Sequence, residues 1–279
     1  MRHYIGIDLG TTNSAICSYD GTNVRVWKSP EQNDVTPSAI YVDKRGNRYY
    51  GNKAYNQAPY NPTNSATLFK RFMGTSTKIE LESAGLSLTP EECSAEILKV
   101  LHGYLPEEIR NDPETAVVIT VPAAFNQMKK DATLQAAKLA GINNVALMQE
   151  PVAAIMSIMR TSKQEGIFLV YDLGGGTFDV SIAENINGKV NLLAHGGIEM
   201  CGGRDIDRMV FNQIVVPWLR LNFNLPEDFL INRKYKTFCR IAQWATERAK
   251  IELSAMEVST IALSEGEART FDEDNNEMY

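Results

Sequence analysis

Residues 7–14 of the chain read IDLGTTNS, and residues 171–179 read YDLGGGTFD. In both stretches an apolar strand ends in an aspartate, a turn of glycine and hydroxyl residues follows, and the chain returns as a second strand. A further strand follows each copy after another glycine turn, at residues 20–21 and at residues 187–188. One such turn is typical of an ordinary hairpin, but two copies with matched flanks indicate an internal repeat. The repeat predicts two lobes of like fold that face one another across a cleft.

The residue types in the two turns suit a phosphate group bound together with a metal ion. Glycines let the backbone approach an anion closely and point successive amide hydrogens toward it. The hydroxyls of Thr11, Thr12 and Thr177 can donate to phosphate oxygens. Asp8 and Asp172, at the strand ends, offer the oxygen ligands that Mg²⁺ prefers. Because the competing P-loop and GxGxxG patterns are absent, the turns predict a site for a nucleoside triphosphate and its metal.

Composition narrows the class of protein. The chain has 279 residues, of which 44% are hydrophobic, so it can bury a sizeable core, in which we expect Trp218 and Trp244. Its formal net charge of −6 argues against non-specific binding to nucleic acid. The four cysteines are scattered without a CxxC pair, which fits a reducing cytoplasm better than a zinc site or a disulfide framework. There is neither the apolar region of a signal peptide nor a run of about 18 apolar residues, so we expect a soluble cytoplasmic chain with no membrane partner.

Apolar periodicity and turn residues predict an α/β protein with mixed sheets. Thr89 and Glu92 form the expected start of one helix, because a hydroxyl cap with a glutamate three residues later is a capping box. Pro217 is expected to kink or split another helix, and the acidic residues 272–274 to form a solvated turn. We expect strands at residues 4–8, 14–19, 24–28, 38–43, 47–51, 115–121, 145–148, 167–172, 178–184 and 189–195, and helices at residues 90–104, 126–140, 151–162, 204–221 and 231–254.

Six segments of the chain resemble, in order, the nucleotide-binding ATPase domain of the seventy-kilodalton heat-shock chaperones. They are IGIDLGTTNSAI, AVVITVPAAFN, ALMQEPVAAIMS, VYDLGGGTFDVSI, GGRDIDRMV and ERAKIELS. The resemblance implies an actin-like ATPase fold of the ribonuclease H-like class, with two lobes of mixed β-sheet flanked by helices and a nucleotide cleft between them. It assigns residues 1–162 to the first lobe, with a shortened flanking subdomain at about 30–113, and residues 163–279 to the second lobe.

The resemblance also implies roles for individual residues around ATP or ADP and Mg²⁺. Asp8 and Asp172 are expected to hold the metal through its water shell. Lys70, which would be taken for a surface lysine from its sequence context alone, is expected to reach the γ-phosphate and the attacking water. Glu150 and Thr177 are expected to position that water and complete the catalytic set with Lys70 and Asp172. The expected nucleotide-binding residues are Gly10, Thr11, Thr12, Asn13, Gly174, Gly175, Gly176, Asp179, Gly202 and Gly203.

The helix expected at residues 231–254 would lie on the adenosine side of the site. At about 100° per residue, one face is polar and the opposite face apolar. From spacing alone, the polar face is a solvated one with an ordinary Glu247–Lys250 pair. Because ERAKIELS resembles the family's adenosine-contacting helix, we interpret the polar residues as ligands of ribose and adenine. The polar residues are Glu247, Lys250 and Ser254, and the apolar stripe is Phe238, Ala242, Ala245, Ala249 and Leu253.

The sequence departs from the family pattern in ways that bear on function. In the family the ATPase domain continues past the ERAK segment and a client-binding domain follows, whereas this sequence ends at Tyr279, so we expect a truncated domain with weaker adenine contacts. The segment between Lys70 and Glu150 is shorter than in the family, which leaves docking of the usual co-chaperones open. Pro122 and Lys130 match positions that relay the nucleotide state to other domains of these chaperones.

Taken together, these features predict a Mg²⁺-dependent ATPase of a chaperone cycle. Hydrolysis would change the closure of the lobes, and a client-binding domain elsewhere would respond. The partners implied for the full-length protein are unfolded client polypeptides, co-chaperones and nucleotide-exchange factors. Two alternatives stay open: a nucleotide-sensing regulatory module with little turnover, and a small-molecule kinase of the actin superfamily. The kinase alternative is less favoured because no sugar-binding signature is found in the sequence.

Overall fold

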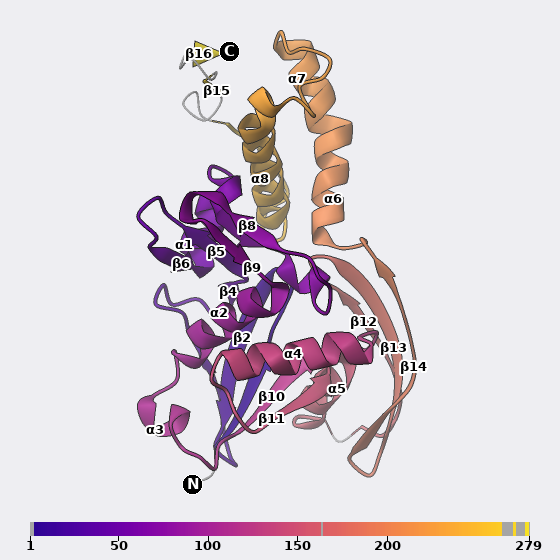
Figure 1. Ribbon diagram of the computed structural model, residues 1–279. Helices are drawn as coiled ribbons and strands as arrows, with labels where there is room; N and C mark the ends of the chain where they lie inside the picture. The colour runs from indigo at the N-terminus through magenta and orange to yellow at the C-terminus, as the bar shows by residue number, and fades with distance from the viewer. Residues whose placement is uncertain (1–2, 163, 264–269, 272–276, 279) are drawn as a thin grey trace.

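The strand before the first glycine turn lies at the centre of the largest sheet. The computed structural model describes residues 3–162, 164–263, 270–271 and 277–278, which leaves out the acidic residues 272–274 (Figure 1). The strand order of the largest sheet is β11-β10-β1-β2-β3, and β4 pairs with β2. β1 runs antiparallel to β2 and parallel to β10. The strands of this sheet are β1 (Tyr4–Asp8), β2 (Asn13–Tyr19), β3 (Val24–Trp27), β4 (Thr36–Pro37), β10 (Ala116–Val121) and β11 (Val145–Gln149).

Buried and more exposed residues alternate along β1, and the buried ones show which face of this sheet is covered. Ile5 and Ile7 are almost fully buried, whereas Tyr4 and Asp8 at the strand ends are exposed. The buried residues belong to one apolar cluster with side chains of α2 (Pro90–His102) and α4 (Gln127–Leu139). The two helices pack against each other beside the sheet (Figure 1). The sheet therefore holds the first glycine turn at the end of a rigid, well-packed strand.

The capping box predicted for α2 is present. Thr89 Oγ1 accepts a hydrogen bond from the backbone N–H of Glu92 at 3.1 Å, and the Glu92 side chain accepts from the Thr89 N–H at 2.7 Å. We expect Thr89→Ala to lower the free energy of unfolding by about 1 kcal/mol, because two N–H groups at the helix start lose their acceptors or their fixed geometry. Denaturant unfolding would measure this loss. Thr22→Ala, in an exposed turn, serves as the control; equal effects of the two changes would contradict a capping role.

Smaller elements surround one edge of the large sheet, where a shortened flanking subdomain is expected. A three-stranded sheet of order β6-β5-β7 lies next to a two-stranded pair, β8 and β9. The elements are β5 (Ala39–Val42), β6 (Arg48–Tyr50), β7 (Ser65–Thr67), β8 (Ile79–Leu81), β9 (Leu86–Leu88), α1 (Gly51–Gln57) and the 3₁₀ turns η1 (Pro62–Asn64), η2 (Phe69–Phe72) and η3 (Glu82–Ala84). The short helix α3 (Glu107–Arg110) lies apart from them, toward the N-terminal end of the chain (Figure 1). A short strand pair, β15 (Thr270–Phe271) and β16 (Glu277–Met278), lies near the C-terminal end.

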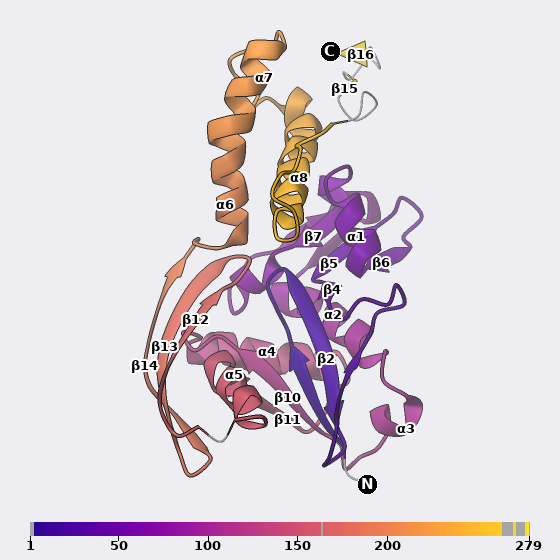
Figure 2. The same cartoon turned by 180° about the vertical axis from the view of Figure 1, so that it is seen from behind.

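The second glycine turn belongs to a separate antiparallel sheet of order β12-β13-β14, which repeats the plan of β1-β2-β3. Its strands are β12 (Gly166–Leu173), β13 (Thr177–Ile186) and β14 (Lys189–Glu199). Helix α5 (Glu150–Met159) lies between the two sheets and contacts both of them (Figure 2). In the part of the chain that the structure describes, β12 has no strand on its other edge, although β1 has β10 in the corresponding place.

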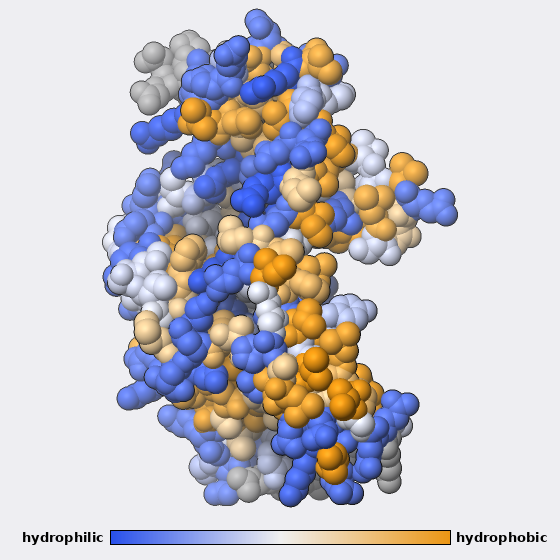
Figure 3. Space-filling model, turned by 90° about the vertical axis from the view of Figure 1, so that its right-hand side faces the viewer, coloured by the Kyte–Doolittle hydropathy of each residue, from blue (hydrophilic) through white to orange (hydrophobic). Residues whose placement is uncertain are grey.

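One face of this second sheet is apolar and exposed. Alternate residues of β12, namely Ile167, Leu169 and Tyr171, are each about two-thirds or more exposed. In Figure 3 the molecule is seen from the side on which β12–β14 lie in Figure 1. Apolar residues gather over the lower part of this side. The other face of β12 is partly covered, because α5 packs against it.

A helical hairpin completes the C-terminal part. The first arm consists of α6 (Gly203–Val210), a π-helical turn, η4 (Phe211–Val215), and α7 (Val216–Asn222). Pro217 lies in the first turn of α7, directly after the π-helical turn. The helix is therefore not split at the proline: residues 203–222 stay helical throughout, and the interruption is this π-helical turn. The second arm is a 3₁₀ turn, η5 (Arg233–Tyr235), followed by α8 (Lys236–Glu252). Apolar residues of both arms form a second core cluster.

Most expected elements are present, with shifted ends. The helix expected at residues 151–162 ends at Met159, and the one expected at residues 231–254 is α8 preceded by a 3₁₀ turn. Trp218 is not in the core as expected: it is 55% exposed, because it lies on the side of α7 that faces away from α8. No helix among the residues that the structure describes has the length and apolar character needed to span a bilayer.

Candidate functional site

The two glycine turns meet in the structure. The first turn joins β1 to β2, and the second joins β12 to β13. A methyl group built on Gly175 would overlap the hydroxyl oxygen of Thr12 and lie 2.9 Å from its β-carbon. The side chain of Thr12 therefore rests directly on the backbone of Gly175, where only a residue without a β-carbon fits. This contact brings together the two copies of the sequence repeat.

The glycine pair at residues 202 and 203 closes against the second turn. The N–H of Gly203 donates to the carbonyl of Gly174 at 2.9 Å, and the N–H of Gly174 donates to the carbonyl of Thr177 at 3.0 Å. A methyl group on Gly202 would lie 2.5 Å from the nitrogen of Gly176 and 2.7 Å from the carbonyl oxygen of Gly174. The backbone that opens α6 can approach the second turn this closely only because residue 202 is a glycine.

Two buried serines hold the first turn. The N–H of Gly10 donates to Ser14 Oγ at 3.1 Å, and Ser38 Oγ donates to the carbonyl of Gly10 at 2.8 Å. The two hydroxyls lie 2.9 Å apart, and the N–H of Ser38 donates to the carbonyl of Thr12 at 2.8 Å. A methyl group on Gly10 would overlap the carbonyl oxygen of Asn13, so the turn is too tight for any other residue. Sequence reasoning gave Ser38 no role, because nothing local marks a serine so far along the chain as a support for this turn.

A cavity of about 720 Å³ opens where the turns meet. This volume lies within the range of pockets that bind small organic ligands, roughly 300–1,000 Å³. Its wall takes residues from both glycine turns, from α6 and from α8, so that segments distant in sequence share one cavity. The expected nucleotide-binding residues that line it are Thr12, Asn13, Gly174, Gly175, Gly203, Glu247 and Lys250.

Lys70 and Glu150 form an ion pair beside the turns. Lys70 lies in η2 and Glu150 is the first residue of α5; Lys70 Nζ donates to Glu150 Oε1 at 3.1 Å. The Lys70 side chain is only 7% exposed and lies over the ring of Phe125, 5.5 Å from its centre. Burial raises the pKa of Glu150, Lys70 opposes that rise, and the carboxylates of Asp8 and Asp172 add to it. Lys70 is therefore a buried site residue and not the surface lysine that its sequence context suggests.

Three aspartates complete this charged cluster. Burial raises the pKa of Asp172, and repulsion from Asp179 and Asp8 raises it further. Asp8 Oδ1 accepts a hydrogen bond from Thr120 Oγ1 at 3.2 Å. Asp172, Asp179 and Glu150 line a small cavity of about 140 Å³. The carboxylates outnumber the one lysine, so the cluster has an excess of negative charge.

Asp8 and Asp172 fit a cation held mainly through water. The repulsion that raises the pKa of Asp172 would be relieved by a positive ion close to these carboxylates. Among the described residues, no three His, Cys, Asp or Glu side chains converge as a direct metal cage would require. Two carboxylates with space for water and phosphate oxygens match Mg²⁺, which keeps several of its waters when proteins bind it.

The polar face of α8 is turned toward α6 instead of solvent. Lys250 Nζ lies 2.7 Å from Asp207 Oδ1 and donates to the carbonyl of Gly203 at 2.9 Å. Glu247, only 7% exposed, accepts from Arg204 at 3.3 Å. These contacts take the place of the Glu247–Lys250 pair that spacing alone suggests. Burial raises the pKa of Asp207, and the hydrogen bond from Lys250 opposes that rise.

The remaining expectations for α8 are met in part. Ser254 lies beyond the end of the helix, is exposed, and does not line the cavity that Glu247 and Lys250 share. Of the apolar stripe, Leu253 is 51% exposed, because it lies past the last turn of the helix. The other stripe residues are buried as expected: Phe238, Ala242, Ala245 and Ala249.

Side chains with no predicted role join the N-terminal part (residues 3–162) to the C-terminal part (residues 164–263). The Glu247 carboxylate hydrogen-bonds the Tyr55 hydroxyl, and burial together with this carboxylate raises the pKa of Tyr55. Arg71 Nη2 lies 3.7 Å from Asp205 Oδ2, and a methyl group on Gly176 would lie 2.6 Å from the same nitrogen. The sequence gives no local signal for Tyr55 or Arg71, because each acts across the contact between segments far apart along the chain.

Four expected residues lie near the cluster without lining the larger cavity. Thr11 is in the first turn, and Thr177 is the first residue of β13. Pro122 follows β10 and accepts a hydrogen bond from the N–H of Phe125, whose ring lies against Lys70. Lys130 lies in the first turns of α4 and is half-buried. The first two thus belong to the turns, and Pro122 is connected to Lys70 through Phe125.

Comparison with known protein families gives a match over nearly the whole chain. A family model described as Hsp70 protein matches residues 4–80 and residues 75–278. The matched residues include both glycine turns, the Lys70–Glu150 pair, the glycines before α6 and the polar face of α8.

Proposed function

Because the chain belongs to the Hsp70 family, whose members carry a chaperone ATPase domain of actin-like fold, we propose that this chain binds ATP with Mg²⁺ and hydrolyses it. The observation that carries the proposal is the contact of Thr12 with Gly175, which brings both glycine turns to one cavity of about 720 Å³. Both copies of the repeated turn can therefore contact one ligand in this cavity at the same time. That arrangement suits a chain of phosphates.

We assign the phosphates to the glycine turns and the nucleoside to α8. Gly10, Thr11, Thr12 and Asn13 would hold the β- and γ-phosphates from one side, and Gly174, Gly175, Gly176, Gly202 and Gly203 from the other. Glu247 and Lys250 line the same cavity, one helical turn apart, and would contact ribose and adenine. Ser254 would join them only if the chain beyond α8 closed toward the cavity, since it is exposed where it lies.

The charged cluster supports hydrolysis by positioning and proton transfer. Mg²⁺, held by Asp8 and Asp172 through water, would neutralise charge on the phosphates. Lys70 would stabilise the negative charge that develops on the transferred phosphoryl group. Glu150, with Thr177 and Asp179, would orient the attacking water and accept its proton. A carboxylate with a raised pKa is a better base for this task than an ordinary glutamate.

The wider role follows from the family. We propose that residues 1–162 and 163–279 act as two lobes whose closure depends on the nucleotide, with Pro122 and Lys130 passing the change outward. In the full-length cytoplasmic protein, a client-binding domain would respond, with unfolded polypeptides, co-chaperones and nucleotide-exchange factors as partners. These assignments rest on family membership and on the positions of the residues named above.

The pH dependence of hydrolysis tests the proposal. Glu150 must be deprotonated to accept a proton, and its pKa is raised, so the single-turnover rate should increase with pH through that raised pKa. We expect Glu150→Gln to remove this dependence and to lower the rate by about 10²-fold or more. Thr120→Val, which removes a hydrogen bond at Asp8 but no charge, serves as the control, because the pH dependence should survive it.

The same measurement separates the alternative functions. Tight binding of ATP without any turnover would contradict hydrolysis and favour a nucleotide-sensing module. Transfer of the γ-phosphate to an added small alcohol would favour a kinase. A pH profile identical in parent and Glu150→Gln would show that Glu150 is not the base.

A further inference from the structure

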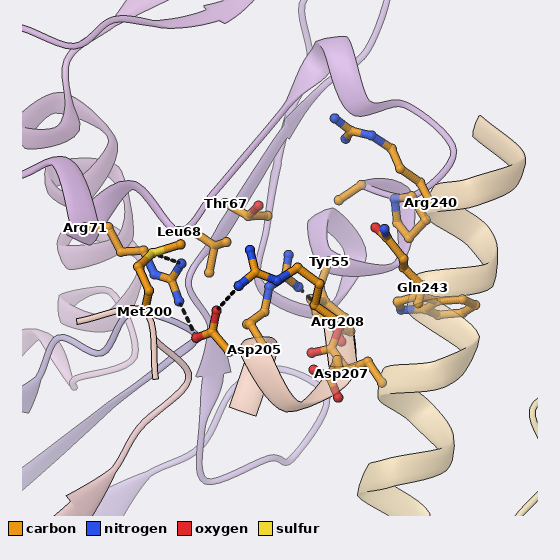
Figure 4. A pocket seen from close by; sticks show the side chains of 15 residues that line it. Tyr55, Thr67, Leu68, Arg71, Met200, Asp205, Asp207, Arg208, Arg240 and Gln243 are labelled. Atoms are coloured by element: carbon orange, nitrogen blue, oxygen red, sulfur yellow. Dashed lines mark hydrogen bonds and ion pairs between the residues drawn. The ribbon is translucent and has the colours of Figure 1, made fainter. Parts of the chain in front are cut away.

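A second cavity, of about 430 Å³, lies beside the one described above (Figure 4). Its wall is formed by the α1–η2 region on one side and by α6 and α8 on the other. Four arginines line it, and we call it the arginine cavity. They are Arg71, Arg204, Arg208 and Arg240. The cavity also takes part of its wall from the aromatic rings of Tyr55 and Trp244.

The carboxylates of this cavity already have positive partners. Asp205 lies 3.3 Å from Arg208 and 3.7 Å from Arg71, and it also accepts from the N–H of Gly202 at 3.0 Å. Figure 4 shows Asp205 between the two guanidinium groups. The charges of these two arginines are therefore partly compensated inside the wall.

The other two acidic residues are also occupied. Asp207 pairs with Lys250 at 2.7 Å, and Glu247 pairs with Arg204 at 3.3 Å. The Glu247 carboxylate also forms a hydrogen bond with the Tyr55 hydroxyl. Among the residues that the structure describes, Asp207 Oδ2 has no hydrogen-bond partner, but no ion pair joins any of the three lining carboxylates to the fourth arginine.

Arg240 is that fourth arginine. No carboxylate in the described part of the chain lies within ion-pair distance of it, and no described side chain accepts a hydrogen bond from it. Burial and the neighbouring charge of Arg204 lower its pKa, and no acidic group offsets them. In Figure 4 its side chain extends from α8 toward the N-terminal part, next to Gln243. Arg240 itself is exposed, so its donors are open to a ligand from solvent. Nearby, Trp244 Nε1 is a buried donor without an acceptor among the described residues.

We propose that the arginine cavity binds a small oxyanion of the phosphate class, with Arg240 as its principal ligand. A guanidinium group presents several N–H donors in one plane and binds phosphate oxygens in pairs. The cavity offers such a group, neighbouring arginines whose charges add to the positive potential, and the amide of Gln243. An oxyanion supplies the acceptors that the wall lacks.

The proposed site adjoins the nucleotide cavity but has a different principal ligand. Arg71 donates to the carbonyl of Gly175 in the second turn at 3.5 Å. The two cavities share the lining residues Tyr55, Arg204, Asp207 and Glu247. Lys70, Thr12 and Asn13 do not line the arginine cavity, and Arg240 does not line the larger one. The smaller volume suits a single phosphate group rather than a nucleotide, whose base and sugar would need the space of the larger cavity. Binding at Arg240 therefore does not depend on whether the chain hydrolyses ATP.

Because the cavity is built by both parts of the chain, bound phosphate should stabilise their contact. Arg71 comes from the N-terminal part and Arg240 from the C-terminal part, at opposite ends of the cavity in Figure 4, so a bound anion would be attracted by positive charge from both parts. A ligand that binds only the folded, closed arrangement raises the midpoint of thermal unfolding, and above Kd this rise grows with the logarithm of the ligand concentration.

Isothermal titration of the nucleotide-free chain with inorganic phosphate, at constant ionic strength, tests the proposal. We expect saturable binding to the parent, weakened about tenfold or more in Arg240→Gln, because a charge-assisted pair of hydrogen bonds is lost. Arg240→Lys keeps the charge but not the planar donors and should bind with intermediate affinity. Lys236→Gln removes one positive charge a turn earlier on α8, outside this cavity, and should bind like the parent.

Lys70→Ala distinguishes this site from the glycine turns. Phosphate binding that survives Lys70→Ala but not Arg240→Gln supports the arginine cavity. Loss of binding in Lys70→Ala with full binding in Arg240→Gln would place the phosphate at the turns and overturn the proposal. No saturable binding to the parent, or equal losses in Arg240→Gln and Lys236→Gln, would overturn it as well. The unfolding midpoint of each variant without phosphate, compared with that of the parent, shows that the variants are folded.

Discussion

Lys70→Ala is expected to lower the single-turnover rate of ATP hydrolysis by about 10²–10³-fold, the usual effect of removing one preorganised group that stabilises transition-state charge. The ammonium group is almost fully buried and is held on Glu150 at 3.1 Å, so its positive charge is fixed in one position in the site. Because charge stabilisation is greatest in the transition state, the rate should fall more than the affinity for ATP. Rapid mixing of labelled ATP with an excess of the variant would measure both the rate of hydrolysis and the affinity for ATP.

A second effect of Lys70→Ala can be separated from the first. Lys70 opposes the rise in the pKa of Glu150, so its removal should raise that pKa further. The pH profile of the residual hydrolysis should then shift to higher pH. Lys138→Ala, on the exposed side of α4, is the matched control and should change neither rate nor profile. An unchanged rate in Lys70→Ala would contradict its catalytic role and favour a module that binds nucleotide without hydrolysing it.

The parts of the fold that the sequence predicts well are those with a strong local cause. The capping box at Thr89 fixes the start of α2 through two hydrogen bonds within four residues. Pro217 interrupts the α-helical hydrogen-bonding pattern because it has no N–H to donate to the preceding turn. The glycine at 10 is needed because a β-carbon there would overlap the carbonyl oxygen of Asn13. Each of these causes can be read from a short stretch of sequence.

The parts that the sequence does not predict depend on contacts between distant segments. Glu247 looks solvated from its spacing, yet it is buried because α6 brings Arg204 against it. Ser38, which lies between β4 and β5, donates a hydrogen bond to the first turn. Tyr55 in the N-terminal part hydrogen-bonds Glu247 in the C-terminal part. No periodicity or motif marks such partners, since their positions follow from the packing of whole elements. Leu253 is the opposite case. Its position in the apolar stripe predicts burial, yet it is exposed because the helix ends at Glu252.

Gly175→Ala is expected to weaken ATP binding by about ten- to hundredfold. The new methyl group would overlap the Thr12 hydroxyl oxygen and lie 2.9 Å from its β-carbon, so the two turns would have to separate. Overpacking of a tight contact costs about 1–3 kcal/mol, and this cost falls on the arrangement that encloses the phosphates. Equilibrium titration with a fluorescent ATP analogue and Mg²⁺ would measure the change.

A compensating change shows whether the contact itself is responsible. Thr12→Gly removes both the hydroxyl and the β-carbon that the new methyl group would strike, so the double variant Gly175→Ala/Thr12→Gly should bind ATP more tightly than Gly175→Ala alone, even though Thr12→Gly by itself removes a phosphate donor. Gly196→Ala is the matched control, because a methyl group there meets no atom within 4 Å and its backbone needs no left-handed conformation. If Gly175→Ala bound like the parent, or if the second change gave no recovery, the two turns would not act together on one ligand. Recovery in the double variant would instead tie the affinity for nucleotide to the distance between the two halves of the repeat, because the other effect of Thr12→Gly, the loss of a phosphate donor, can only weaken binding.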